Sequence, residues 1–105
     1  MIVYVAGPYR GANAWDIERN IQRAEAISAR LWEMGHVPVC PHLLTRNFAG
    51  LTDEQVFLDG LIELMRRCDC VLVIARSAGT DEEIIEATKV GLPVYWTMAE
   101  LIKDL

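Results

Sequence analysis

Two adjacent carboxylates, Glu82 and Glu83, follow a small-residue turn that ends an apolar run, and they are the strongest candidates for chemistry. Residues 71–75 show no alternation of polar and apolar side chains, which is typical of a strand buried on both faces of a parallel sheet. The turn that we expect after this strand contains Ser77, Gly79 and Thr80. Open α/β sheets bind ligands beyond the carboxyl ends of their strands, where a following helix presents unpaired N–H groups. We therefore expect a ligand site at this turn.

The period of the α-helix separates the roles of the two carboxylates. Glu83 shares a stripe with Ala87 that must pack on the sheet, because helical residues four apart lie on one face. Glu82 shares a polar stripe with Glu86 and Lys89, which is typical of a solvated face. Burial would raise the pKa of Glu83 and a helix N-terminus would lower it, so the sequence predicts no net direction. Glu83 is either a functional carboxylate or a first-turn acid that complements the helix dipole.

A second group of candidate residues follows the first apolar run, residues 2–6, which we predict to be a buried strand. Gly7 begins a tight turn with the proline after it, and Tyr9 and Arg10 follow. Carboxyl ends of parallel strands meet at one edge of a sheet, so this ring and guanidinium could face the acid across one crevice. The alternatives are an edge aromatic and a surface charge. His42, just past a second strand, either reaches the same crevice or is a hydrogen-bonded structural histidine.

Helices with clear sequence signals must position these groups. Helical spacing of apolar residues predicts a helix over residues 16–34, with Gly35 as the stop. Asn20 falls on the buried side of that helix, so we expect its amide to bond backbone groups of the preceding loop. Capping boxes at residues 52–55 and 97–100 predict two further helices, the first ending near Arg67.

The strands complete an alternating βαβαβαβα pattern, which predicts a flavodoxin-like or Rossmann-like, doubly wound parallel α/β sheet. Pro38 lies in the middle of the second strand, residues 36–40, and confines that strand to an edge because proline donates no ladder hydrogen bond. Residues 91–96 give a fourth strand. We predict the strand order 2-1-3-4, with room for a fifth strand, and a switch point above the two turns described. Residues 43–51 are expected to form an irregular loop beside the site.

The charge and length of the chain limit its possible partners. The 105 residues predict one domain, residues 1–105, with one core. Ten basic and fifteen acidic residues leave a formal charge of −5, which argues against a surface for a nucleic-acid polymer or an anionic membrane. A small anionic ligand needs only local donors and remains compatible with this charge.

Location signals predict a cytoplasmic protein. The N-terminal residues lack the basic start and cleavage site of a signal peptide, and no apolar run approaches the roughly 20 residues of a membrane span. Three cysteines, Cys40, Cys68 and Cys70, lie in or beside apolar segments, which favours reduced, buried thiols over a disulfide framework. A metal site is disfavoured because no second ligand pair accompanies the last two cysteines.

The order of several short motifs resembles the nucleoside 2-deoxyribosyltransferase superfamily, which includes the deoxynucleoside 5′-monophosphate N-glycosidases and the small DUF4406-type proteins. The motifs are GPYRG after the first strand, Asn20, CPH after the second strand, RRCDCVLVI, S-x-G-T-x-x-E with Ala87, and GLPV. The resemblance covers almost the whole chain. It implies a flavodoxin-like sheet, a nucleoside or nucleotide substrate, and a homodimer or higher homo-oligomer with sites near subunit interfaces. It also implies no metal and no organic cofactor.

The same resemblance assigns roles to individual residues. Glu83 matches the family's nucleophilic glutamate, and Ser77 with the turn at Gly79 would hold the 5′ end or phosphate of the substrate. Arg10 would contribute charge, and Tyr9 would line the sugar or base pocket. The substrate-binding residues implied in this way are Gly7, Tyr9, Arg10, His42, Asp59, Ser77, Gly79 and Thr80.

One position departs from the family pattern. Leu61 stands where the family usually has an aspartate that assists the nucleobase and the nucleophile. Asp59 is the nearest acid, but two residues along a helix turn the side chain by about 200°, so Asp59 replaces this aspartate only after a register shift or bulge.

The resemblance and its departure at Leu61 leave two candidate functions. The first is cleavage of the N-glycosidic bond of a deoxynucleoside or its monophosphate, by hydrolysis or transfer. The alternative is a non-catalytic nucleotide-binding module of the same fold.

Overall fold

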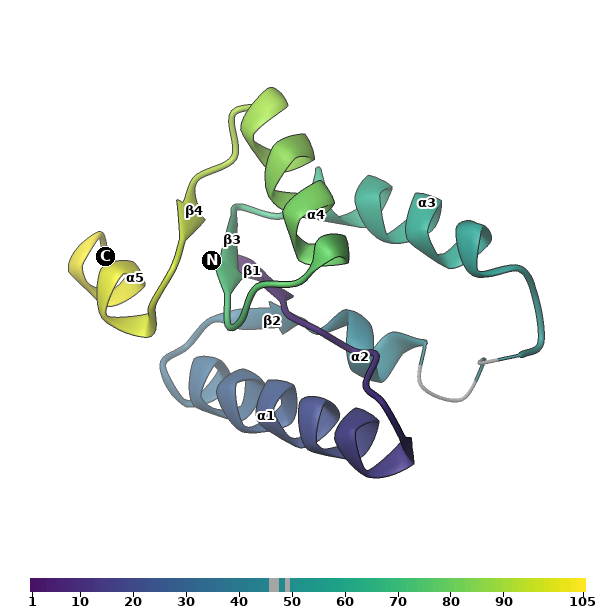
Figure 1. The fold of residues 1–105 in the computed structure, drawn as a ribbon. Coiled ribbons are helices and arrows are strands. Elements are labelled where there is room, and N and C mark those ends of the chain that lie inside the picture. Colours follow the sequence, from purple (N-terminus) through teal and green to yellow (C-terminus); the bar gives the residue numbers. More distant parts are fainter. Residues whose placement is uncertain (46–47, 49) are drawn as a thin grey trace.

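A parallel sheet of four strands in the order β2-β1-β3-β4 forms the centre of the molecule (Figure 1). The computed structural model describes residues 1–45, 48 and 50–105. The strands are β1 (Ile2–Ala6), β2 (Val37–Val39), β3 (Cys70–Val73) and β4 (Val94–Tyr95). The helices are α1 (Ala14–Glu33), α2 (Pro41–Leu44), α3 (Glu54–Met65), α4 (Ala78–Lys89) and α5 (Met98–Lys103). This confirms the predicted doubly wound α/β fold and its strand order. Within the described ranges a fifth strand is not formed.

Alternating side chains of β1 and β3 supply the cores on the two faces of the sheet. Val3 and Val5 pack with Leu72, Leu31 of α1 and Leu101 of α5 on one face. The opposite face contains a second cluster, made of Tyr4, Ala6, Met65, Cys68, Val71, Val73 and Ala87. Figure 1 shows α1 below the strands and α3 and α4 above them. The two central strands are therefore covered on both faces, as their unbroken apolar sequences predict.

Helix α1 confirms the sequence signals that predicted it. Asn13 caps its N-terminus by accepting a hydrogen bond from the N–H of Asp16 at 2.9 Å. Gly35 follows its C-terminus with a positive φ of 85°, a conformation that favours glycine. The side-chain amide of Asn20 donates to the carbonyl oxygens of Tyr9 at 3.3 Å and Arg10 at 3.1 Å. The predicted role of Asn20 in holding the preceding loop is confirmed.

Strand β2 lies at the sheet edge, as Pro38 predicted. It pairs with β1 in parallel, with Pro38 opposite Val3, and no second strand covers its other side in the described part of the chain. An edge position tolerates the missing N–H of proline because half of the edge strand's backbone groups face away from the sheet. The three cysteines are free and buried, as the sequence predicts for apolar segments.

The boundary between β3 and α4 differs from the sequence prediction. The strand ends at Val73 and not at Ala75, and the helix begins at Ala78, before Glu82. The reason is the side chain of Ser77, which accepts the N–H of Thr80 at 3.2 Å and caps the helix early. Gly79 and Thr80 therefore lie in the first helical turn and not in the turn before it. Glu82 and Glu83 move into the second turn of α4.

The region before α3 also differs in detail. Asp53, and not Thr52, caps the helix by accepting the N–H of Gln55 at 2.8 Å. Helix α3 ends at Met65, two residues before the predicted end. In the predicted loop 43–51, the first two residues belong to α2. Residues 46, 47 and 49 of that loop lie outside the described residues.

The N-terminus of α5 is capped by the residue that the predicted capping box names, unlike the N-terminus of α3. Thr97 caps the helix by accepting the N–H of Glu100 at 3.1 Å. The carboxylate of Glu100 accepts the N–H of Trp96 at 2.8 Å, one residue before the position of an ideal capping box.

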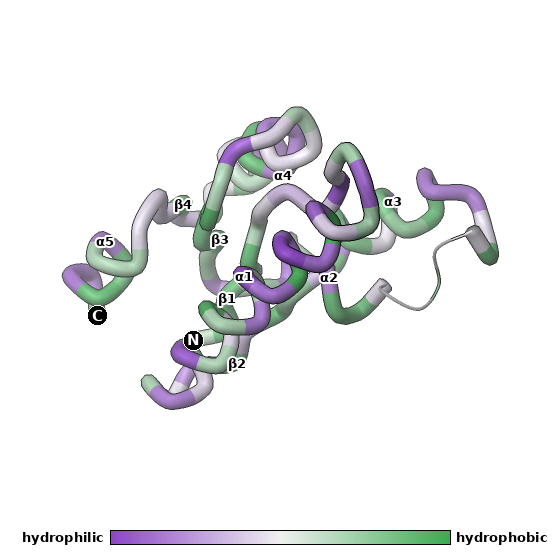
Figure 2. The backbone as a smooth tube through the Cα atoms, turned by 60° about the horizontal axis from the view of Figure 1, so that its bottom comes forward, coloured by the Kyte–Doolittle hydropathy of each residue, from purple (hydrophilic) through white to green (hydrophobic). Residues whose placement is uncertain are grey.

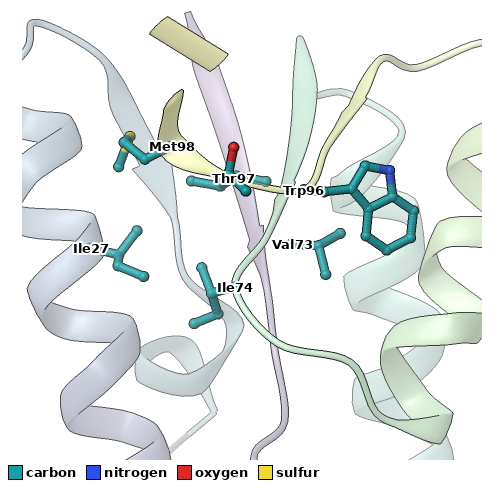
Figure 3. A pocket seen from close by; sticks show the side chains of 7 residues that line it. Ile27, Val73, Ile74, Trp96, Thr97 and Met98 are labelled. Atoms are coloured by element: carbon teal, nitrogen blue, oxygen red, sulfur yellow. The ribbon is translucent and has the colours of Figure 1, made fainter. Parts of the chain in front are cut away.

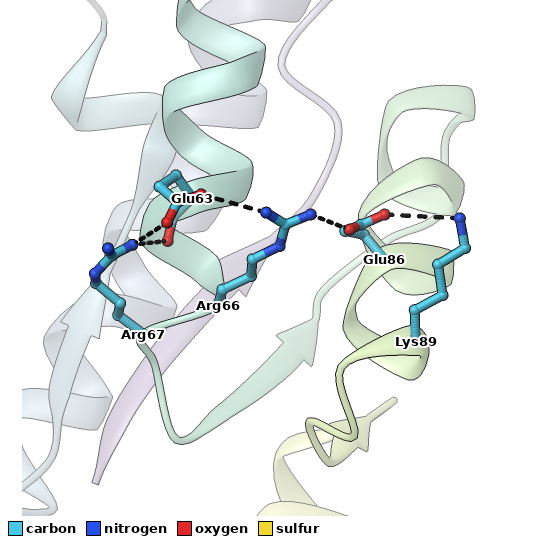
Figure 4. A network of polar contacts seen from close by, with 5 residues as sticks. All are labelled: Glu63, Arg66, Arg67, Glu86 and Lys89. Atoms are coloured by element: carbon cyan, nitrogen blue, oxygen red, sulfur yellow. Dashed lines mark hydrogen bonds and ion pairs between the residues drawn. The ribbon is translucent and has the colours of Figure 1, made fainter.

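Helix α3 packs mainly through its C-terminal end, where Met65 is its one fully buried residue. An ion pair between Arg66 and Glu86 joins this end to α4, and Arg66 also pairs with Glu63 of α3 at 3.3 Å (Figure 4). Lys89 approaches the same Glu86 carboxylate at 3.9 Å.

Figure 2 shows mostly hydrophobic colouring along α3. In the described part of the chain, no helix combines the length and apolar character needed to cross a membrane.

The turn after β1 generates a stability prediction. A Cβ atom added at Gly7 would lie 2.5 Å from Cγ1 of Ile74, whereas a Cβ at Gly60 in α3 meets nothing within 4 Å. Gly7→Ala should lower the free energy of unfolding by about 1–3 kcal/mol through overpacking. Gly60→Ala should raise it by up to about 1 kcal/mol, since alanine favours the helix. Urea denaturation measures both, and a Gly7→Ala protein as stable as wild type would refute the predicted close packing.

Candidate active site

Parallel pairing of β1 with β3 brings the two turns predicted from the sequence to one edge of the sheet. Ala6 lies opposite Val73 in the register, and the N–H of Ile74 donates to the carbonyl of Ala6 at 2.8 Å. The Gly7 turn and the segment leading to Ser77 therefore leave the sheet side by side. This is the topological switch point, at which open α/β sheets place their ligands.

Helix α4, which follows β3, carries Glu83. Thr80 and Ala87, which flank Glu83 on its helix face, are 1% and 0% exposed, so this face packs on the sheet. Glu83 is half-buried and Glu82 is exposed. The predicted difference between the two adjacent carboxylates is thus confirmed, because the helix turns only one of them toward the sheet.

Burial dominates the electrostatics of Glu83. Loss of solvent raises the pKa of this carboxyl group, the hydroxyl of Tyr4 lowers it, and the neighbouring Glu82 charge raises it further. The net pKa is raised above its ordinary value. The sequence left this direction open because a helix N-terminus opposes burial. The early start of α4 resolves it, since the influence of the helix dipole falls off within the first turn and Glu83 lies in the second.

Tyr4 is a site residue that the sequence analysis missed. It is fully buried in β1, and burial together with the Glu83 charge raises the pKa of its phenol far above the ordinary range, so the phenol stays protonated. The hydroxyl lies near Glu83 but closes no hydrogen bond of ordinary geometry there. A hydroxyl in the otherwise aliphatic run IVYVA was the available signal. A tyrosine in that position must direct its polar end somewhere inside the protein.

Ser77 and the start of α4 form a compact cap. The hydroxyl of Ser77 lies 2.7 Å from that of Thr80, and the carbonyl of Ser77 accepts the N–H of Asp81 at 2.9 Å. The side chain of Arg76 pairs with Asp81 at 3.0 Å. The N–H groups of Thr80 and Asp81 are thus used inside the cap. We expected this turn to bind anions. The N–H groups of Ala78 and Gly79 are the donors that remain at the open end of the helix.

His42 is buried beneath the β1–α1 loop and lies in α2, not in a loop. It is 3% exposed, and its Nε2 is 2.8 Å from the carbonyl oxygen of Pro8. A carbonyl oxygen only accepts hydrogen bonds, so Nε2 carries the proton. Burial lowers the pKa of His42, which keeps the ring neutral, and its centroid lies 5.8 Å from that of Tyr9. This geometry matches the hydrogen-bonded alternative, in which His42 and Tyr9 shape the loop.

The remaining predicted residues lie further out. Arg10 has a side chain that is 73% exposed and pairs with Glu54, at the start of α3. Asp59 is exposed, and its carboxylate accepts the side-chain amide of Gln55 at 2.8 Å. Helix α3 runs without a break, so the register shift that would bring Asp59 to the position of Leu61 is absent. Burial, the Tyr4 hydroxyl and the Glu82 charge set the pKa of Glu83, and Asp59 is not among these causes.

An apolar hollow of about 250 Å³ lies near the carboxyl ends of β3 and β4 (Figure 3). Its lining residues are Ile27, Leu72, Val73, Ile74, Trp96, Thr97 and Met98. The guanidinium of Arg76 lies 5.5 Å from the ring centroid of Trp96 at its rim. None of the lining side chains is a carboxylate, histidine or thiol. This hollow therefore lacks acid–base groups.

Comparisons with known proteins agree with the fold. The sequence matches the family model described as a domain of unknown function, DUF7768, over residues 1–97. Comparison with the curated proteins finds no match. A 2-deoxyribosyltransferase from Bacillus psychrosaccharolyticus superposes with a TM-score of 0.70 at 17% identity, covering 90% of this chain and 69% of that one. A 2-deoxyribosyltransferase from Leishmania mexicana gives 0.67 at 21% identity, covering 89% and 61%. At these identities the similarity establishes a shared fold, and the chain spans about two thirds of each enzyme's length.

The raised pKa of Glu83 predicts how its neutralisation affects stability. A folded-state pKa above the ordinary 4.5 means that ionised Glu83 destabilises the folded protein at neutral pH, and that this penalty fades as pH falls through the folded pKa toward 4.5. Glu83→Gln should therefore be more stable than wild type at pH 7, with the difference disappearing near pH 4. Thermal unfolding at both pH values measures this. Glu82→Gln is the comparison and should give a smaller gain in the same direction, because it removes only the repulsion between the two carboxylates and leaves Glu83 buried. A Glu83→Gln variant less stable than wild type at pH 7 contradicts the argument.

Proposed function

We propose that this chain, which belongs to the DUF7768 family, cleaves the N-glycosidic bond of a 2′-deoxynucleoside or its 5′-monophosphate with Glu83 as the nucleophile. The observation that supports the proposal is the burial of this carboxyl group beside the Tyr4 phenol of β1, on the helix that follows β3. The fold shared with two 2-deoxyribosyltransferases supports the reaction class. The proposal treats residues 1–105 as one domain and requires no metal or organic cofactor.

The chemistry follows the two-step logic of retaining glycosidases. A carboxylate oxygen of Glu83 attacks the anomeric carbon, the bond from that carbon to the base nitrogen breaks, and the base leaves after taking up a proton. The resulting glycosyl ester is then attacked by water, giving hydrolysis, or by a second base, giving transfer. Desolvation favours the attack because a poorly hydrated carboxylate loses little solvation when it reaches the transition state.

Tyr4 would act as a positioning residue for this nucleophile. Its phenol is protonated and fully buried, so it can donate a hydrogen bond to one Glu83 oxygen while the other attacks. The loop at Gly7 and Tyr9 would form the wall of the substrate site, with His42 holding it from below. The open N-terminus of α4, at Ser77 and Gly79, would accept the 5′ end or its phosphate, since helix N-termini attract anions.

A non-catalytic nucleotide-binding module is the second candidate, and Leu61 favours it. This residue is half-buried at the position where the resembled family usually has an aspartate, and the nearest acid, Asp59, is exposed on the same helix. The described residues then hold a nucleophile and its positioning phenol, but no assigned acid for the departing base. Such a module would bind nucleotides in the same crevice without efficient turnover.

Exposed apolar residues suggest that the protein functions as a homo-oligomer. Ile85 on the outer face of α4 is 56% exposed, and α3 exposes Val56 and Leu58. Among the described strands, β4 pairs with β3 only, so its outer edge is also open. Apolar helix faces and open strand edges of this kind are commonly covered by a second subunit.

Self-association can be tested by light scattering. We expect a mass above that of the monomer, and Ile85→Arg should shift it toward the monomer because it places a charge on the apolar face. Trp32→Arg is the control, since Trp32 is similarly exposed, at 59%, but lies on α1 across the sheet. A monomeric wild-type protein at high concentration would rule out this hypothesis.

Base release provides the direct test of Glu83. Wild-type protein is incubated with a panel of deoxynucleosides and their monophosphates, with and without a second base, and free base is followed by chromatography. Glu83→Gln should reduce the rate by several powers of ten, because an amide cannot form the glycosyl ester. Glu82→Gln should change it by less than about tenfold, since that side chain is solvated. Tyr4→Phe should give an intermediate loss with an altered pH profile.

The outcomes separate the two candidate functions. If Glu83→Gln keeps more than a tenth of wild-type activity with an intact fold, the nucleophile assignment is wrong. If wild type releases no base but binds a nucleotide, the module with Leu61 in place of the aspartate is the better description.

A further inference from the structure

A polar hollow of about 310 Å³ lies between the β1–α1 loop and the outer surface of α1. It is lined by Arg10, Gly11, Asp16, Arg19, Asn20 and Arg23. The mechanism above uses neither of the two α1 arginines. Arg19 and Arg23 are four residues apart, so their side chains emerge on one face of the helix, about 6 Å apart along its axis.

The charges in this hollow are unbalanced. Within the described ranges, neither Arg19 nor Arg23 forms an ion pair, whereas Arg10 pairs with Glu54. Asp16 is the one acid in the lining, and its carboxylate accepts the backbone N–H of Ala12 at 3.2 Å. Like charges four residues apart destabilise a helix, so two unpaired guanidinium groups side by side on α1 carry an energetic cost. An acidic chain with net charge −5 nevertheless places them together.

The walls of the hollow are held in place before any ligand binds. The side-chain amide of Asn20 donates hydrogen bonds to the carbonyl oxygens of Tyr9 and Arg10, which holds the loop against α1. Gly11 packs so closely on the helix that an added Cβ would lie 2.3 Å from the Cβ of Asp16. A site with fixed walls loses little conformational entropy on binding.

We propose that this hollow binds the diphosphate group of a small molecule, with Arg19 and Arg23 as its ligands. A guanidinium group presents paired N–H donors that match the oxygens of a phosphate, and two such groups one helical turn apart can hold adjacent phosphates. A diphosphate suits the hollow better than a nucleic-acid strand, because the surrounding chain is acidic. This site is independent of Glu83 and does not rest on the proposed glycosidase activity.

Titration with inorganic pyrophosphate, followed by amide chemical shifts of the whole protein, tests the proposal. We expect saturable shifts in residues 10–12 and 16–24. Arg19→Gln and Arg23→Gln should each weaken binding at least fivefold. Arg30→Gln is the matched control, because Arg30 lies on the same face of α1 but outside the hollow, and it should change the affinity less than twofold. All three substitutions keep a good helix former, so circular dichroism should show unchanged helix content.

Two further arms identify the source and the location of binding. In the first arm, a deoxynucleoside diphosphate should produce the same chemical-shift changes as pyrophosphate, which would show that the diphosphate itself is recognised. In the second arm, inorganic monophosphate should produce much weaker changes, which would show that both arginines are needed. Glu83→Gln should leave these shifts unchanged. Equal losses in all three arginine variants would mean that general charge attraction explains the binding. That result, an absence of shifts in residues 10–24, or shifts confined to residues 77–83 would overturn the proposal.

Discussion

The parallel pairing of β1 with β3 is the constraint on which the rest of the structure depends. It places Ala6 opposite Val73, and the next backbone hydrogen bond, from Ile74 to Ala6, fixes where both strands stop. Gly7, Tyr9 and Arg10 follow the first of these strand ends, and Ser77 and Glu83 follow the second. Because the strands are buried on both faces, the register cannot slip by one residue without exchanging the side chains of the two cores. Tyr4 is therefore held on the same face as α4.

Glu83 shows a conflict between stability and chemistry. It lies on the helix face that carries the buried Thr80 and Ala87, and the burial that raises its pKa makes the ionised carboxylate costly for the folded protein. Such a cost is common at functional sites and rare at positions that serve folding alone. The Ser77 cap sets how far the carboxylate lies from the helix start, and so decides that burial and not the helix dipole controls its pKa.

The β1–α1 loop connects the candidate active site with the arginine-lined hollow. Three consecutive carbonyls of this loop accept side-chain hydrogen bonds, with His42 binding Pro8 and Asn20 binding both Tyr9 and Arg10. The loop is thus held from α2 on one side and from α1 on the other. Its inner turn contacts the end of β3, and its outer surface contributes to the hollow.

Features that depend on local periodicity could be predicted from the sequence. Apolar runs, capping residues and Pro38 were enough to predict the strand order, and the helical period alone separated Glu83 from Glu82. Contacts between residues far apart in the chain became known only from the folded structure. The hydroxyl of Tyr4 lies near the carboxyl group of Glu83, which is 79 positions later in the chain, and the guanidinium of Arg10 binds Glu54. Packing between elements sets both contacts, and no local sequence pattern encodes them. Cap selection also needed the structure, since Ser77 and Asp53 each competed with neighbouring residues of similar capping ability.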